Sequence, residues 1–262
     1  MKRSSGARLC ATAAIGALSL SLLTACSDDG SKDTADSKPS ASASASTSSS
    51  APAGKALTSA ELEKLLLAKG DLKGYEANSG DDTLPKSKSQ VKTDKPACDP
   101  LAWATAGLAP GDTNANASNQ ISEDKASTAT AQPTDLADAF NIDMTFVGLS
   151  SYAGDGAEKT MKAVSDSVTA CAGGYGLAAD GEKSKVTKVA AEKGSGKGDE
   201  SVAFAETVDM DGEGTATFHA EAIRSGSTIA TFYTVNFAAF EKGGDMGPVP
   251  AAVIDAQVAK LR

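Results

Sequence analysis

Histidine and cysteine are scarce in this chain, which has one histidine and four cysteines among 262 residues. With His219 as the single imidazole and no CxxC motif, the soft ligands that zinc and copper prefer are too few for such a site. His219 also has no GxSxG serine or free cysteine nucleophile in the surrounding sequence, which leaves the common hydrolase templates without support. We therefore expect no metal, no cofactor and no enzymatic activity, with a hydrolase dependent on His219 as an alternative to test.

Basic and aromatic residues are also few. The formal net charge is −9, from 25 Lys and Arg against 34 Asp and Glu, and aromatic residues make up 5% of the chain. Nucleic-acid backbones require a basic footprint, so we expect no nucleic-acid partner.

No apolar run is long enough to remain in a membrane as a helix. The most apolar one covers residues 11–23 and follows the basic residues Lys2, Arg3 and Arg8. A transmembrane helix needs about 20 apolar residues, whereas a basic start and a shorter apolar run are typical of a signal peptide. We therefore predict a signal peptide over residues 1–25.

The leader ends in Leu23-Thr24-Ala25-Cys26, which resembles the lipobox of bacterial lipoproteins. The resemblance implies cleavage after Ala25 and a diacylglyceryl cysteine at Cys26, carrying palmitate-type chains. Two acyl chains make a durable anchor, so the mature chain would be held on the extracellular face of the cell membrane. The alternative is a secretory signal with a chance cysteine.

Residues 26–56 form the next segment, in which ten serines occur and aromatic and branched aliphatic residues do not. Such a composition cannot bury enough apolar surface to offset chain entropy, so we predict a disordered tether with a reach of about 30 Å. It is similar to the linkers of actinobacterial lipoproteins. Residues 57–262 then suit one extracytoplasmic domain.

Two cysteines remain for this domain once Cys10 leaves with the leader and Cys26 carries lipid. Cys98 and Cys171 are expected to form a disulfide, because secreted proteins fold in an oxidising environment. A metal or redox role for this pair is the weaker alternative.

Local patterns predict an α+β domain. Thr58–Glu61 is a capping box, residues 140–146 alternate apolar and polar side chains, and the apolar positions of 155–171 fall on one helical stripe. We expect helices over 58–70, 99–107, 155–171 and 250–261, and strands over 118–123, 140–146, 186–190, 202–208, 215–224 and 228–237. The predicted architecture is an antiparallel sheet with helices packed on one side.

This order of elements resembles the PknH-like extracellular sensor domain, over nearly all of residues 57–262. The resemblance rests on the helix ending in Val168-Thr169-Ala170-Cys171, on Gly198-Asp199-Glu200-Ser201, and on the turn Ile223-Arg224-Ser225-Gly226. It implies an antiparallel sheet and helices around a cleft, displayed outside mycobacterial and related cells on a kinase or a lipoprotein. The family pattern has two disulfides, whereas this domain has one pair of cysteines.

Three residues are weak candidates for ligand binding. Trp103 either packs beside the disulfide or anchors an apolar ligand in a cleft. Arg224 and Tyr233 are either near a hairpin rim, where they would contact a ligand, or simply solvated, which is the favoured alternative. Two motif-like segments are discounted. The run 209–214 starts like a calcium loop but has Ala220 at the position of the bidentate Glu, and 194–198 lacks the spacing of a phosphate loop.

The function predicted from these features is a non-enzymatic, membrane-anchored ligand-binding or sensor module. Its partners would be the membrane, through the lipid, and a small molecule, a wall fragment or a membrane protein. The alternative is a lipid carrier, similar to mycobacterial lipoproteins with a half-barrel cavity. A large dry cavity under the sheet would favour the carrier, and a shallow polar cleft the sensor.

Overall fold

The computed structural model describes residues 55–79, 83–113, 115–124, 141–179, 181–211 and 214–262. The predicted leader, the lipidation residue Cys26 and the tether lie outside these ranges, as does Phe140 of the predicted 140–146 strand. The described residues fall within one unit of tertiary contacts. None of the helices in these ranges is long and apolar enough to cross a bilayer.

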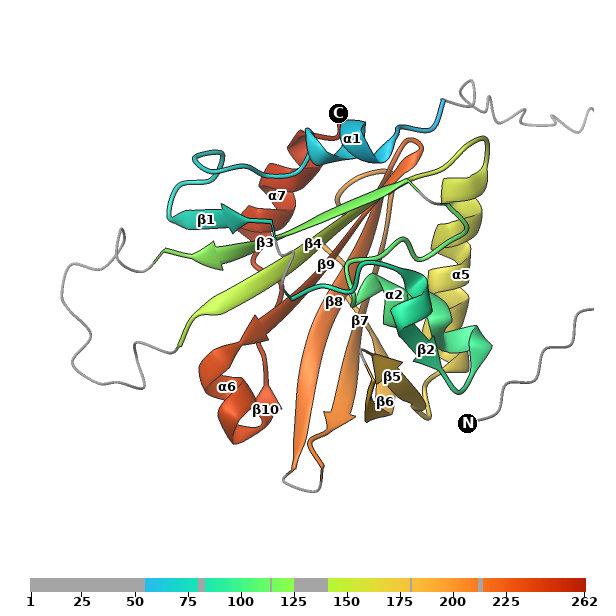
Figure 1. Cartoon of the computed structure of the whole chain (residues 1–262), viewed down its shortest axis with the longest axis vertical. Helices are drawn as coiled ribbons and strands as arrows, with labels where there is room; N and C mark the ends of the chain where they lie inside the picture. The colour runs from blue at the N-terminus through green and yellow to red at the C-terminus, as the bar shows by residue number, and fades with distance from the viewer. Residues whose placement is uncertain (1–54, 80–82, 114, 125–140, 180, 212–213) are drawn as a thin grey trace, which may run out of the picture. The chain divides into compact units, whose positions relative to one another are not determined.

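A ten-stranded sheet forms the centre of the fold, in the order β1-β3-β4-β9-β8-β7-β6-β5-β2, with β10 beside β8 (Figure 1). Its strands are β1 (Tyr75–Asn78), β2 (Val91–Thr93), β3 (Asn116–Glu123), β4 (Asp143–Ser151), β5 (Tyr175–Ala179), β6 (Glu182–Glu192), β7 (Glu200–Asp209), β8 (Thr215–Ser225), β9 (Thr228–Asn236) and β10 (Gly244–Asp245). All pairs are antiparallel except β10 with β8. The predicted α+β class and the antiparallel meander are confirmed.

Helices cover both faces of the sheet (Figure 1). They are α1 (Ser59–Glu63), α2 (Asp99–Ala104), α5 (Gly156–Ala170), α6 (Phe237–Lys242) and α7 (Ala251–Ala259). One buried core joins α2 and α5 to the sheet and includes Leu101, Met161 and Phe204; we call this side the α5 face. A second core joins α1 and α7 to the sheet and includes Leu62, Phe232 and Ile254; we call this side the α7 face.

The expectation that helices pack on one side only is therefore corrected. Strand β9 explains why, because Ile229 belongs to the core on the α5 face while its neighbour Ala230 belongs to the core on the α7 face, both with 0% exposure. A strand that is apolar on both sides has to be covered on both sides. The sequence analysis assumed strands with one buried face, and for that reason it did not predict helices on the second face of the sheet.

The first helix is shorter than predicted, although its capping box is confirmed. The Glu61 backbone N–H donates to Thr58 Oγ1, and the Glu61 carboxylate accepts the Thr58 N–H at 2.8 Å. The helix ends at Glu63 instead of near Gly70, because side-chain amides from elsewhere pair with the backbone that follows. Gln257 of α7 accepts the Leu67 N–H at 3.0 Å and donates to the Leu65 carbonyl at 2.8 Å.

Replacing Gln257 with Leu is expected to lower the free energy of unfolding by about 2–3 kcal/mol, because two backbone groups would lose their partners in a buried setting. Gln257 is fully buried, so water cannot take over its role. Urea unfolding measures the change, with Ala259→Leu at an exposed position of the same helix as the control. A loss no larger than that of the control would contradict the role of Gln257.

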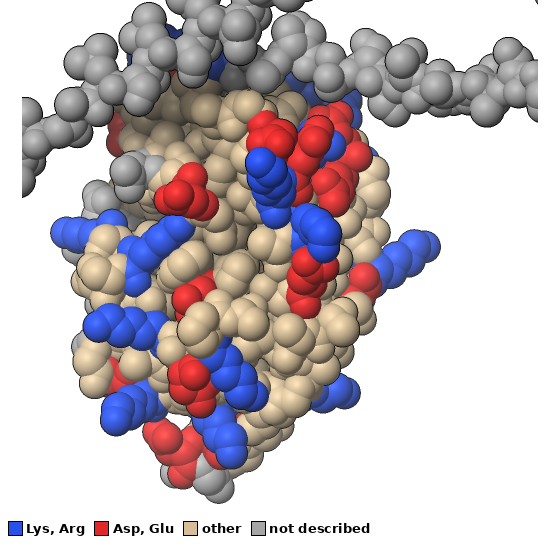
Figure 2. Space-filling model, turned by 90° about the vertical axis from the view of Figure 1, so that its right-hand side faces the viewer, with Lys and Arg blue, Asp and Glu red and all other residues tan. Residues whose placement is uncertain are grey.

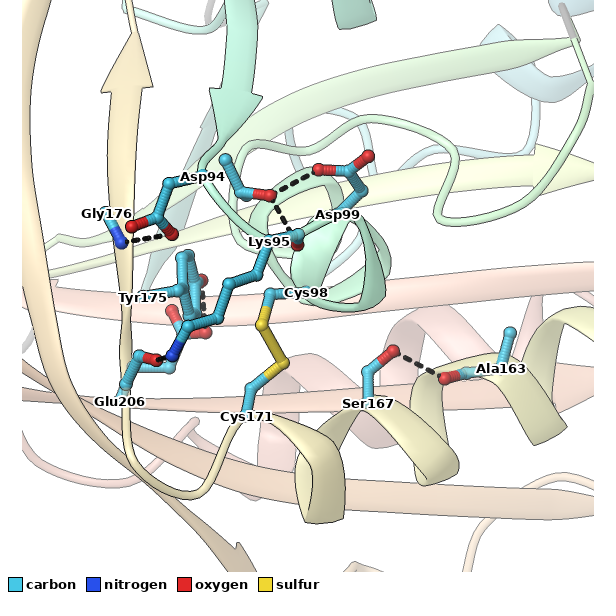
Figure 3. Close-up of a disulfide and its surroundings, with 12 residues drawn as sticks. Asp94, Lys95, Cys98, Asp99, Ala163, Ser167, Cys171, Tyr175, Gly176 and Glu206 are labelled. Carbon is cyan, nitrogen blue, oxygen red and sulfur yellow. Dashed lines mark hydrogen bonds between the residues drawn. A yellow bond between two sulfur atoms is a disulfide. The ribbon is translucent and has the colours of Figure 1, made fainter.

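The disulfide between Cys98 and Cys171 is present, as predicted. It joins the start of α2 to the end of α5 (Figure 3). Two further links lie beside it: Lys95 Nζ donates to the Gly174 carbonyl, and the Gly176 N–H donates to Asp94 at 2.8 Å. These contacts place β2 next to β5, a pairing that local sequence patterns did not predict.

Candidate functional site

A pocket of about 200 Å³ lies on the α7 face, between the end of β6, the middle of β8 and the start of α7. We call it the β8 pocket. Ionisable and polar groups on one wall (Glu192, Ser195, His219 and Glu221) face apolar groups that include Val249 and Ile254. Strand alternation puts His219 and Glu221 on the same face, two residues apart along β8.

His219 is held between two carboxylates. Its Nδ1 lies 2.9 Å from a carboxylate oxygen of Glu192, and its Nε2 lies 2.9 Å from one of Asp245. Burial by itself lowers the pKa of His219, but the hydrogen bonds and charges of Glu192 and Asp245 outweigh it and raise the pKa above its ordinary value. The Gly247 N–H, and then His219, lower the pKa of Asp245. In the imidazolium form, both ring nitrogens can donate to these carboxylates.

Glu221 forms the buried end of the same wall, with 6% of its surface exposed. Its Oε1 accepts both the backbone N–H and the hydroxyl of Ser195, each at 2.7 Å. Ser195 belongs to the 194–198 segment that resembled a loose phosphate loop; here it is fixed against the sheet. The Ser195 hydroxyl thus donates to the Glu221 carboxylate.

The carboxylate contacts of His219 limit what its ring nitrogens can do in this arrangement. A general base needs an imidazole nitrogen free to accept a proton, and both nitrogens of His219 are engaged with carboxylates. Within the described ranges, no group of three or more His, Cys, Asp or Glu side chains could hold a metal ion. The pocket offers instead fixed charges and hydrogen-bonding groups beside an apolar wall, which is the usual make-up of a small-ligand site.

The three residues proposed from the sequence as weak ligand contacts do not line the β8 pocket. Trp103 and Tyr233 both pack against the core on the α5 face. Lys88 Nζ lies 4.2 Å from the Trp103 ring centre, and Tyr233 stacks on Phe146 at 4.7 Å. A ligand role for them stays a prediction.

Arg224, the third of them, holds a turn together. Its Nη1 donates to Asp199 and to the Gly226 carbonyl, each at 3.3 Å, and Asp199 also accepts the Gly226 N–H at 2.7 Å. This network ties the β8–β9 turn to the start of β7. Arg224 therefore has a structural role in the hairpin that the sequence analysis singled out.

The sequence analysis did not identify four residues of this site, because they come from separate segments and no motif links them. These residues are Glu192, Ser195, Glu221 and Asp245. The period-two pattern of 215–224 would have placed His219 and Glu221 on one face. Periodicity could not reveal the contribution of Asp245, because β10 has two residues and Asp245 lies 26 positions from His219 in the sequence.

The 209–214 run forms the turn between β7 and β8. The Met210 N–H donates to the Gly214 carbonyl at 3.0 Å, and Asp211 adopts a left-handed backbone conformation with φ of 53°. Gly212 and Glu213 lie outside the described residues. The geometry agrees with the hairpin-turn interpretation favoured from the sequence.

A buried acid lies on the opposite face of the sheet. Glu206 accepts a hydrogen bond from the Tyr175 hydroxyl at 2.7 Å, close to the disulfide (Figure 3). Burial raises the pKa of Glu206 to about 7, and this exceeds the lowering by its hydrogen bonds. Burial, followed by the charge of Glu206, raises the pKa of Tyr175 as well. This pair belongs to the core and lines neither of the two pockets described here.

A second pocket, of about 350 Å³, lies at the edge of β3 among Glu63, Leu84, Lys86 and Asn116.

Comparison with known proteins finds no matching protein-family model and no matching curated protein. Among solved structures, the chain is similar to the crystal structure of the extracellular domain of PknH from Mycobacterium tuberculosis. The sequence identity is 12% and the TM-score is 0.43, and the match covers 79% of this chain and 95% of that chain. This is the same domain that the sequence pattern resembles, but a likeness at this level carries no argument about ligand or role.

Proposed function

We propose that this chain is a membrane-tethered, extracytoplasmic binding or sensor module that is not an enzyme. Its ligand is a small polar molecule held in the β8 pocket. The observation that carries the proposal is the composition of this pocket: a doubly hydrogen-bonded His219 and a buried Glu221 on one wall, and apolar side chains on the other. Pockets that enclose drug-sized ligands measure roughly 300–1,000 Å³, so a pocket of about 200 Å³ suits a smaller solute.

The tethered location is supported by the sequence. The basic and apolar leader, the lipobox at Cys26 and the serine-rich segment that follows together suit an anchored secreted domain. The Cys98–Cys171 disulfide suits an oxidising compartment. A nucleic-acid partner has no support, and Figure 2 shows Lys and Arg mixed with Asp and Glu on the side that bears α5.

The lipid-carrier alternative has less support. Such a carrier needs a large apolar cavity, yet Phe204 and Phe232 are fully buried in the cores on the two faces of the sheet. Both pockets described above carry charged or polar groups in their linings. Side chains thus fill the space under the described sheet where an acyl chain would have to lie.

Native mass spectrometry of the full chain, extracted from its own host in mild detergent, tests the proposal. A small-molecule adduct is expected, and Ala251→Trp should remove it because Ala251 lines the pocket at the start of α7. Ala252→Trp is the matched control, since Ala252 is exposed on the same helix and does not line the pocket. An adduct of lipid mass would favour the carrier, and an adduct unaffected by Ala251→Trp would contradict the assigned site.

The anchor is tested separately by metabolic labelling with a clickable palmitate analogue. Labelling is expected for the native chain and its loss for Cys26→Ser. Recovery of unlabelled native chain from the cytosol would contradict the proposed location.

A further inference from the structure

The segment between α6 and α7 meets the sheet through a short stretch of backbone pairing and the buried Met246 side chain. Residues 243–250 contain Gly243, Gly244 and Gly247, all with positive φ. The backbone pairs with β8 over two positions, and the Met246 N–H adds one bond to the Thr217 carbonyl at 2.9 Å. The segment continues through Pro248 and Val249, which form part of the wall of the β8 pocket. The Met246 side chain is buried and Val249 packs against the core on the α7 face, and the polar side-chain tie of the segment to the sheet is the bond between Asp245 and His219 Nε2.

That tie depends on the protonation state of His219. An imidazolium has two N–H donors, whereas a neutral imidazole has one donor and one acceptor. Both ring nitrogens face carboxylate oxygens, from Glu192 on β6 and Asp245 on β10. When His219 loses a proton, one nitrogen lone pair therefore faces a carboxylate, and one of the two bonds is lost.

Asp245, and not Glu192, is the carboxylate that loses its hydrogen bond to His219. Its side chain is 69% exposed, against 34% for Glu192, so water can replace the lost bond at lower cost. Glu192 ends the eleven-residue strand β6, which is paired along β7, while Asp245 lies among glycines. Asp245 also keeps the bond from the Gly247 N–H at 2.8 Å, which does not depend on His219.

No other charged group opposes this assignment. Glu221, on the same strand and face, is bonded to Ser195. Lys193 follows Glu192 in the pocket lining, and β7 presents Ala205 opposite His219. The elements packed around His219 thus contribute Glu192, Asp245, Glu221 and Lys193 as the described charged neighbours. The hydrogen bonds and charges of Glu192 and Asp245 raise the pKa of His219 above its ordinary value, in the direction that the proton-dependent tie requires.

We infer that His219 is a proton-dependent latch on the β8 pocket. In its protonated form it holds the 243–249 segment against β8, and when it loses the proton it releases Asp245 and loosens the pocket wall. The inference rests on the proposed function in so far as this wall bounds the proposed ligand site. For a histidine whose pKa is raised by folding, the stabilisation is complete below the pKa of the unfolded chain and is lost as the pH rises through that of the folded chain.

The single histidine of the chain makes the test direct. The imidazole NMR signals of the ligand-free full-length protein are followed from pH 5 to pH 9, together with the hydrogen-exchange protection factors of the Met246 amide, which donates to the Thr217 carbonyl of β8. The midpoint for His219 is expected to lie above that of the urea-unfolded chain. The protection factors should fall about tenfold through the same midpoint, as expected for the loss of one charge-assisted hydrogen bond.

Asp245→Asn is the informative variant. The Asn carboxamide can accept from a protonated Nε2 or donate to a deprotonated one, so the protection of the segment should no longer change with pH. Asp255→Asn removes the same charge near the pocket, from the ion pair with Lys197, and should leave the pH dependence unchanged.

A His219 midpoint at or below that of the unfolded chain would overturn the latch, as would Met246 protection that does not follow the His219 midpoint. Because no ligand is present in this titration, its result is independent of the ligand test. A working latch without an adduct would refute the proposed function alone, and an adduct without pH-dependent protection would refute the latch alone.

Discussion

Removal of the disulfide by Cys98→Ala and Cys171→Ala together is expected to lower the free energy of unfolding by about 4 kcal/mol. The two cysteines are 73 positions apart, so their cross-link restricts a long loop in the unfolded chain. Alanine is chosen because both cysteines are fully buried, and a serine hydroxyl would need a new hydrogen-bond partner. Urea unfolding at fixed pH, with and without the substitutions, measures the difference.

Other native contacts lie beside the disulfide, so the double variant should still fold. Its loss of stability should then come from the greater freedom of the unfolded chain. Lys95 with Gly174 and Asp94 with Gly176 link the same two regions, so the folded structure should persist without the sulfur bridge. The denaturant slope m should rise, because the uncross-linked chain exposes more surface on unfolding. Reduced wild-type protein is the control and should match the double variant. A loss below about 1 kcal/mol would show that the cross-link restricts the unfolded chain much less than loop closure predicts.

Replacing the buried Glu206 with Gln is expected to raise stability at pH 8 by about 3 kcal/mol and to change it little at pH 4.5. Folding raises the pKa of Glu206 from 4.5 to about 7, first of all through burial. Between these values the folded state keeps a proton that the unfolded state has lost. Stability therefore falls as the pH rises through this window, and the cost is complete above it. A neutral Gln avoids the cost of burying a charge, and its side-chain oxygen can still accept a hydrogen bond from the Tyr175 hydroxyl.

The measurement needs a background in which His219 does not titrate, because the stabilisation from its raised pKa is also lost as the pH rises. Urea unfolding of His219→Gln is therefore compared with His219→Gln/Glu206→Gln at several values from pH 4.5 to pH 8. Glu182→Gln in the same background is the control, since Glu182 is exposed on β6. Equal pH dependence with and without Glu206 would contradict the assignment of a buried, protonated carboxyl.

Features that depend on neighbouring residues were predicted well from the sequence. The capping box at Thr58–Glu61 starts a helix, and the apolar stripe of 155–171 forms α5 with Cys171 facing the core. The order of strands from β6 to β9 also follows from short glycine-bearing turns between period-two segments. In each case the signal lies within about one turn or one hairpin.

Features that depend on distant partners were not predicted. Residues 64–70 looked helical, but Gln257 pairs with their backbone from a position 190 residues away from Leu67. Strand β10 forms because Gly244 and Asp245 pair with the part of β8 that β9 does not cover. Its local sequence of glycines and an aspartate gives no strand signal. The same applies to the β8 pocket, whose ionisable groups come from β6, β8 and the loop after β6.

The sequence by itself determined the α+β class, through its periodicities, and the single disulfide of the described domain, through its two cysteines. An anchored chain is what its first 26 residues predict. Only the tertiary structure decided that helices cover both faces of the sheet, and that His219 lies between Glu192 and Asp245. The reason is physical. Periodicity and capping act over a few residues, whereas burial and the pairing of charges depend on which distant segments the fold brings into contact.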